Sequence, residues 1–137
     1  MQKLVDGQLV DLTQAEIDER NAETAAAESQ AITDRIKTYR REKENGGITV
    51  SGVTVQTDVE SRASLLGAKE LGVSIDWKTE AGFVTLTAQQ ISAIAVAVGQ
   101  HVQKCFSAEK TVNEAHAQTP YTSIQDIETA FDNAYNS

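Results

Sequence analysis

His101 and Cys105 are the side chains whose chemistry and spacing first point to a reactive site. They stand four residues apart in a stretch with helical periodicity, so both would lie on one face of a helix. Such a pair is able to bind a metal ion or to form a thiol–imidazole nucleophile. Cys105 also falls within the apolar stripe of the same stretch, with His101 at its edge, and this favours a buried structural role. The other histidine, His116, has no partner that the sequence identifies.

Two carboxylate pairs, Asp58 with Glu60 and Asp126 with Glu128, could be considered as an acid and a base. Asp58 and Glu60 stand at an expected helix start, where acidic residues cap the backbone and oppose the helix dipole without any catalytic role. No glycine-rich turn is followed by Lys and Ser or Thr at P-loop spacing, so nucleotide hydrolysis is not supported. We therefore expect a protein with no enzymatic activity, cofactor or metal ion.

The composition narrows the classes of partner. The 137 residues carry a formal net charge of −8, and nucleic acid is not expected because phosphate binding requires clustered Lys and Arg. A single cysteine allows no internal disulfide, which suits a reducing compartment. No apolar stretch has the length of a signal peptide or a membrane span, so we expect a soluble protein made in the cytoplasm.

The elements that would position these residues begin with a leader, residues 1–13. Two short apolar runs flank Asp6-Gly7, which predicts a small hairpin. A hairpin this short is unstable alone, so the leader either docks on another surface or is flexible. Thr13 with Glu16 then predicts the start of a long helix, residues 14–45.

This long helix is the expected element for docking or oligomerisation. It is rich in alanine and poor in large apolar residues, so its first half stands free, packs on its own protein through alanine, or meets copies of itself. Basic residues near its end suggest a phosphate site, but Asp34, Glu42 and Glu44 interleave with them and weaken the field. The residues expected to contact a partner are Leu4, Val5, Leu9, Val10, Ile17, Ala25, Ile32, Ile36 and Tyr39.

Residues 46–118 are expected to form a small α+β domain. A first hairpin is followed by a helix that Thr57 and Glu60 would cap. A second hairpin follows, in which Trp77 and Phe83 would pair across the strands over the core. The next helix, which Thr87 and Gln90 would cap, carries a broad apolar stripe and is the expected main core helix.

The predicted fold class is therefore α+β. A long N-terminal helix precedes a small ββαββα unit of two antiparallel hairpins and two helices, and a short C-terminal helix lies within residues 119–137.

Five short stretches of the sequence, taken in their order along the chain, carry a family resemblance. They are residues 46–58 (GGITVSGVTVQTD), 66–68 (LGA), 76–79 (DWKT), 82–87 (GFVTLT) and 101–106 (HVQKCF). This order, within residues 34–115, resembles a domain of unknown function from tailed bacteriophages and prophages. Residues 9–17 also resemble the openings of small phage proteins encoded near tail-fibre genes. Members are generally described as phage tail, tail-fibre or fibre-assembly proteins, and the family has no established catalytic motif to carry over.

The resemblance implies a non-enzymatic structural component of a bacteriophage tail, associated with the tail, baseplate or tail fibre and acting by protein–protein binding. The alternative is a tail-fibre assembly chaperone that is absent from the mature virion. Expected partners are phage tail, baseplate or tail-fibre proteins, with neither nucleic acid nor membrane among them. The expected location is the virion, after synthesis in the host cytoplasm.

The resemblance also bears on the oligomeric state. Because phage fibres are commonly trimeric, a homotrimer is the favoured homo-oligomer. Three parallel copies would place the acidic halves of the long helix side by side, although salt screens that repulsion beyond roughly 10 Å.

Overall fold

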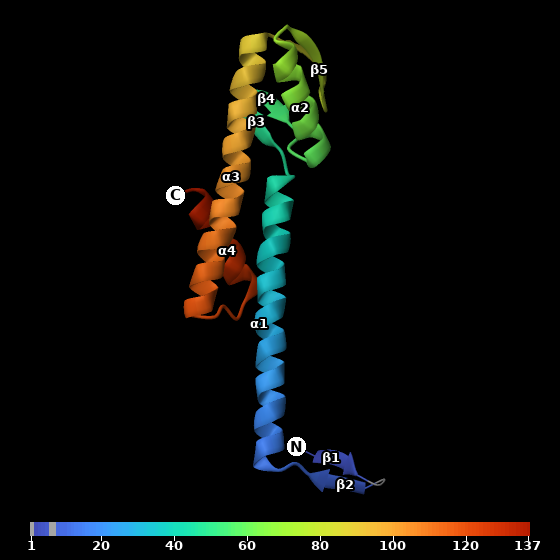
Figure 1. Ribbon diagram of the computed structural model, residues 1–137, viewed down its shortest axis with the longest axis vertical. Helices are drawn as coiled ribbons and strands as arrows, with labels where there is room; N and C mark the ends of the chain where they lie inside the picture. The colour runs from blue at the N-terminus through green and yellow to red at the C-terminus, as the bar shows by residue number, and fades with distance from the viewer. Residues whose placement is uncertain (1, 6–7) are drawn as a thin grey trace.

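The computed structural model describes residues 2–5 and 8–137, and Figure 1 shows an elongated molecule built along two long helices. Within these residues the fold is α+β, as predicted, with helices and antiparallel two-stranded hairpins. The elements are β1 (Gln2–Val5), β2 (Gln8–Asp11), α1 (Gln14–Glu44), β3 (Ile48–Val50), β4 (Val53–Val55), α2 (Val59–Leu71), β5 (Ile75–Thr79), β6 (Gly82–Leu86), α3 (Ala88–Gln118) and α4 (Ile124–Tyr135). No helix of the described residues is long and apolar enough to cross a membrane.

The starts of α1 and α3 are fixed by the local sequence. At α1, Thr13 Oγ1 accepts a hydrogen bond from the Glu16 backbone N–H over 3.2 Å. At α3, Thr87 and Gln90 form a complete capping box, in which each side chain accepts a hydrogen bond from the other residue's backbone N–H. Both helix starts agree with the sequence-based prediction.

The start of α2 differs from the prediction. Asp58 is the N-cap, and its carboxylate accepts a hydrogen bond from the Ser61 backbone N–H over 3.3 Å. The predicted capping box of Thr57 with Glu60 is therefore wrong. Thr57 is fully buried and bonds instead to backbone groups at the end of α1.

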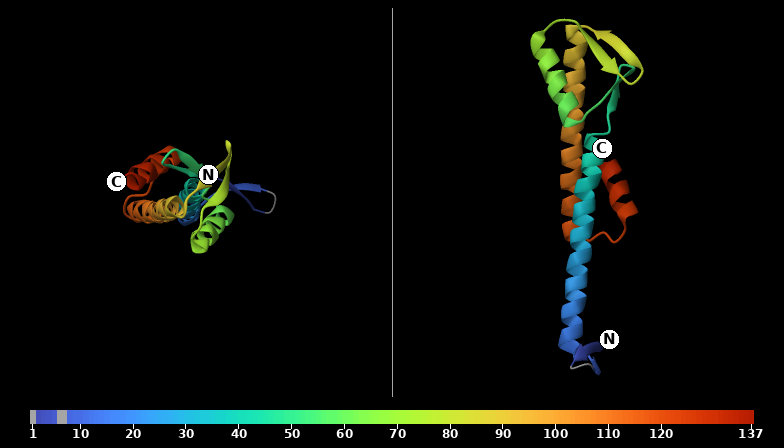
Figure 2. Two further views of the ribbon diagram at one scale, coloured as in Figure 1. Left: turned by 90° about the horizontal axis from the view of Figure 1, so that it is seen from above. Right: turned by 90° about the vertical axis from the view of Figure 1, so that its right-hand side faces the viewer.

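Helix α3 runs through the two hydrophobic cores found in the described residues. Its first half, α2 and the hairpins β3–β4 and β5–β6 enclose the head core, made of Val55, Leu65, Ala68, Leu86, Ile91, Ile94 and Val98. Its second half packs with α1 and α4 around the bundle core, made of Ile36, Cys105, Ala108, Val112, Ile127 and Phe131. Figure 2 shows α4 to one side of the α1–α3 pair. One helix therefore contributes side chains to both cores.

The register of β5–β6 separates the two aromatic residues that the sequence analysis paired. Trp77 lies opposite Val84, and Phe83 lies opposite Lys78. Since neighbouring residues of a strand point to opposite faces, Trp77 packs on the head core while Phe83 is 73% exposed. The prediction of a Trp77–Phe83 pair over the core is therefore wrong, because it ignored this alternation.

The two cores meet at the C-terminal end of α1. The Thr57 hydroxyl donates to the Glu44 carbonyl over 2.6 Å and accepts from the Gly47 N–H over 2.9 Å. The Glu44 carboxylate pairs with Arg40 of α1 and, over 3.2 Å, with Arg62 of α2. This end of α1 is thus bonded to the head by one buried hydroxyl and one ion-pair cluster.

Replacing Thr57 with Val should lower the free energy of unfolding by about 2 kcal/mol, because it leaves the buried Glu44 carbonyl and the half-buried Gly47 N–H without this hydroxyl. Thr49→Val is the matched control: Thr49 is exposed on β3, where its hydroxyl meets only that of Thr54. Its effect should stay within about 0.5 kcal/mol. Urea denaturation measures both values, and equal stability of the two variants would contradict the assigned role of Thr57.

Candidate functional site

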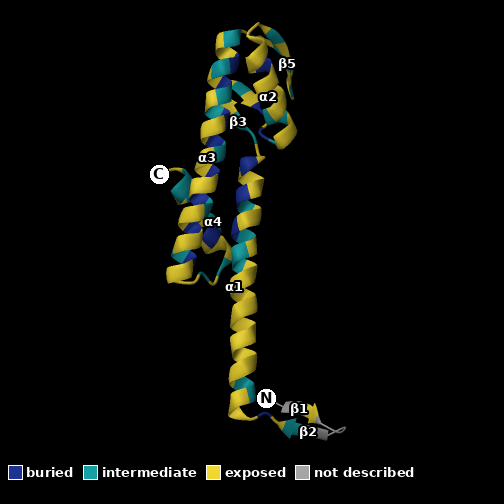
Figure 3. Ribbon diagram, in the orientation of Figure 1, coloured by how far each residue is buried: buried dark blue, intermediate teal, exposed yellow. Residues whose placement is uncertain are grey.

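The N-terminal arm is the part of the chain that leaves the packed body. We define the arm as residues 2–5 and 8–25, which comprise β1, β2 and the first turns of α1. Figure 1 shows that this part of α1 projects past the α3–α4 turn and ends at the hairpin. Every residue from 18 to 31 is exposed, as the yellow stretch of α1 in Figure 3 shows.

The hairpin of the arm is held against the start of α1. Lys3 forms an ion pair with Glu16, and its ammonium lowers the pKa of that carboxyl below the ordinary value. Leu12, between the hairpin and the helix, is only 7% exposed. The ion pair joins the hairpin to the start of its own helix, and the choice between a docked and a flexible leader stays a prediction. The predicted turn residues Asp6 and Gly7 lie outside the described residues.

The structure leaves part of the predicted partner surface on the arm. Leu4 is 68% exposed, Ala25 is exposed, and Val10 and Ile17 are half-buried. The backbones of Val5 and Leu9 pair within the hairpin, while their side chains lie outside the described residues.

Three predicted contact residues serve the chain's own packing instead. Ile36 is 2% exposed in the bundle core, and Ile32 and Tyr39 pack against that core. The Tyr39 ring meets Phe131 edge-on at 5.2 Å, and its hydroxyl donates to Asp132 over 2.9 Å. These side chains are occupied within the chain, so the arm carries what remains of the predicted partner surface.

His101 and Cys105 lie together, as their spacing predicts, but both ring nitrogens of the histidine are engaged elsewhere. Nε2 lies 2.9 Å from the Lys43 carbonyl, which only accepts, so Nε2 carries the hydrogen. The Tyr135 hydroxyl then donates to Nδ1 over 2.6 Å. Lys43 and Tyr135 are remote from His101 in sequence, so no local pattern marks them as its partners. His101 thus closes the end of α1 and fixes α4 to α3.

Cys105 has the environment of a structural thiol. It is fully buried, with Sγ 3.9 Å from His101 Nε2, whose hydrogen already goes to Lys43. Burial raises the pKa of this thiol to about 11. A protonated thiol beside an imidazole whose two nitrogens are already hydrogen-bonded is not arranged for nucleophilic attack, because the thiolate is the reactive form.

His116 lies at the other end of the bundle, next to the base of the arm. Its Nδ1 accepts from the Tyr121 N–H over 3.0 Å, and its Nε2 lies 3.2 Å from Ser29 Oγ of α1. The ring stacks on Tyr121. His116 therefore holds the α3–α4 turn against α1 just where α1 leaves the body.

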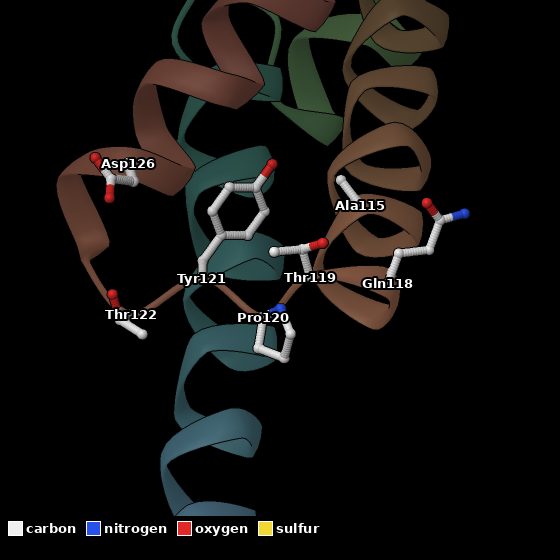
Figure 4. A pocket seen from close by; sticks show the side chains of 7 residues that line it. All are labelled: Ala115, Gln118, Thr119, Pro120, Tyr121, Thr122 and Asp126. Atoms are coloured by element: carbon white, nitrogen blue, oxygen red, sulfur yellow. The ribbon is translucent and has the colours of Figure 1, made fainter.

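Tyr121 lines two surface hollows. One, of about 490 Å³, is mostly apolar and lies between α1 and the α3–α4 turn. The other, of about 300 Å³, appears in Figure 4, where Asp126 and Gln118 stand at opposite ends. The lining side chains converge on no shared point, so this hollow has no pair of acid and base groups.

The basic stretch of α1 is largely neutralised inside the chain. Arg35 pairs with Glu42 and Glu128. Arg40 pairs with Glu44 and Glu109, and Lys43 lies 3.6 Å from Asp132. This pairing argues against the phosphate-site reading of the stretch. In the described part of the chain, no group of three or more His, Cys, Asp or Glu side chains is placed to hold a metal ion.

Comparison with known proteins adds one match. The chain matches the family described as "Domain of unknown function (DUF4376)" over residues 26–133. No curated protein and no solved structure matches it. The matched range begins where α1 approaches the bundle and ends within α4, so the arm lies before the matched domain.

The Cys105 thiol should be unreactive in the folded protein. With a pKa of about 11, roughly one thiol in a thousand is ionised at pH 8. An aromatic disulfide reagent should therefore label the native chain at least a hundred times more slowly than the same chain unfolded in urea. Labelling of the native protein at the unfolded rate would contradict the buried, protonated thiol.

Proposed function

Because this chain belongs to the DUF4376 family of domains of unknown function, whose description names no activity, we propose its function from its geometry and its sequence resemblance. It is a non-enzymatic structural component of a bacteriophage tail. It binds a tail, baseplate or tail-fibre protein through its arm, and its place is the virion.

The observation that carries this proposal is the exposed arm. Residues 18–31 form helix without any buried residue, and the hairpin sits at the far end of that helix. An isolated helix of this length is marginal in water. Here it continues a helix already fixed in the bundle, and its alanines favour helix formation. This exposed helical segment, which meets the packed body where Ser29 lies beside His116, is suited to carry the hairpin to a second protein.

The bacteriophage context of the proposal rests on the sequence stretches within residues 46–106 that resemble phage proteins. The geometry supports the mode of action, which is binding. His101 and Cys105 support the non-enzymatic part, because their polar atoms complete the fold.

The alternative function is that of a tail-fibre assembly chaperone. The observation that favours it is the small apolar surface of the arm, on which Leu4 is the one large hydrophobic side chain found to be exposed among the described side chains. Little apolar area suits transient binding. If the fibre protein trimerises and stays soluble when it is expressed without this chain, the chaperone function is excluded.

Leu4→Asp and Phe83→Asp form a matched pair for testing the arm. Both replace an exposed apolar side chain, 68% and 73% exposed, on hairpins at opposite ends of the molecule. In a phage that lacks its own copy, we expect Leu4→Asp to lower incorporation into particles at least ten-fold and Phe83→Asp to leave it unchanged. Mass spectrometry of purified particles measures both.

Two outcomes of this experiment would contradict the proposal. Equal incorporation of the variants would show that the arm does not carry the binding. Absence of the unmodified chain from finished particles would contradict the virion function and favour the chaperone.

A further inference from the structure

A groove between α2 and α3 is a second surface feature, besides the arm, that leaves large apolar side chains exposed. It is a hollow of about 270 Å³ in the head, far from the arm. Leu66 and Phe106 stand on its walls, while Ala95 and Gly99 line it with little or no side chain. Arg62 is the one charged residue among those lining it.

Gly99 is the clearest sign that the groove receives something. It stands inside the 31-residue helix α3, where glycine is less favourable than alanine. A Cβ added at this position would meet no atom within 4 Å, so close packing within the chain does not require glycine. The open space above it is available to a group from outside the chain.

The groove and its walls are complementary to themselves. Leu66 is 58% exposed and Phe106 is 42% exposed, so both project beside the hollow over Gly99. A surface that carries both projections and a hollow is able to pack on a second copy of itself about a two-fold axis, as isologous dimers do.

The charged residues of α2 are also placed to pair about a two-fold axis. Arg62 stands four residues before Leu66, and Glu70 stands four residues after it. If two α2 helices pair antiparallel with Leu66 at the axis, Arg62 of each copy lies opposite Glu70 of the other. Arg62 is half-buried and forms an ion pair with Glu44 over 3.2 Å. Glu70 is exposed in the last turn of α2, so its carboxylate is accessible to a partner.

We propose that two copies of this chain associate through this face, with α2 antiparallel to α2 of the partner and Leu66 near the two-fold axis. Because α2 lies along α3 (Figure 1), this pairing directs the two arms away from each other. The dimer would present one arm at each end. The inference does not depend on the proposed function, and it favours a dimer over the homotrimer that fibre symmetry implies.

Sedimentation equilibrium of the full chain over a range of concentrations tests the pairing, with the chain itself as the probe. We expect a reversible monomer–dimer equilibrium. A chain that is monomeric at all concentrations, or that forms trimers, would overturn the proposal.

Gly99→Leu and Gly67→Leu test the hollow. An added Cβ meets no atom within 4 Å at either position, and Gly67 lies about 100° around α2 from Leu66, away from the groove lining. We expect Gly99→Leu to weaken dimerisation at least ten-fold and Gly67→Leu to leave it unchanged. Equal dimerisation of the two variants would overturn the proposal.

Glu70→Lys provides an independent test that does not alter the groove. In the proposed dimer, this change places a lysine opposite Arg62 at both symmetry-related contacts. Because these like charges repel, we expect at least ten-fold weaker dimerisation at low salt. Glu60→Lys makes the same charge change on the face of α2 that lines a hollow with Trp77 and Lys78, and it should have little effect. Circular dichroism confirms folding of each variant, and similar dissociation constants for the two would contradict the paired charges.

Discussion

The last turn of α1 leaves backbone carbonyl groups that the helix itself cannot satisfy, and the rest of the structure depends on how they are bonded. The Lys43 carbonyl accepts from His101 of α3, and the Glu44 carbonyl accepts from Thr57, just before α2. One helix end is thereby tied to both cores at once. Tyr135 completes this contact by donating to the other nitrogen of His101, which brings α4 to the same place. The burial of His101 and Thr57 is explained by this one structural requirement.

The contacts at the C-terminal end of α1 determine where the arm lies. With its C-terminal end fixed beside the middle of α3, α1 runs alongside the second half of α3 and continues beyond the α3–α4 turn. His116 and Ser29 mark the place where it leaves the body. The acidic first half of α1 is consequently the arm, while its basic second half lies among Glu109, Glu128 and Asp132 of α3 and α4. The charge asymmetry that complements the helix dipole thus also separates an exposed segment from a packed one.

The sequence predicts those features whose causes are local. Thr13 and Thr87 begin their helices as expected because their partners stand three residues away. Thr57 was assigned to the same motif and acts differently, because its bonding partners are backbone groups that only the fold brings near. Phe83 was misplaced because the strand register, not the mere presence of two aromatics, determines which face each occupies. For the candidate site, the spacing of Ile32, Ile36 and Tyr39 identifies an apolar face of α1 but does not tell an internal contact from an external one.

We propose that the arm, and not the head or the bundle, contacts the tail protein that this chain binds. Cross-linking of intact phage particles followed by mass spectrometry tests it directly, because amines are present in both regions: Lys3 lies on the arm, and Lys69, Lys78, Lys104 and Lys110 lie on the body. We expect links to a tail, baseplate or fibre protein to come from Lys3 and the neighbouring arm carboxylates. Links to such proteins that come from the body alone would contradict it.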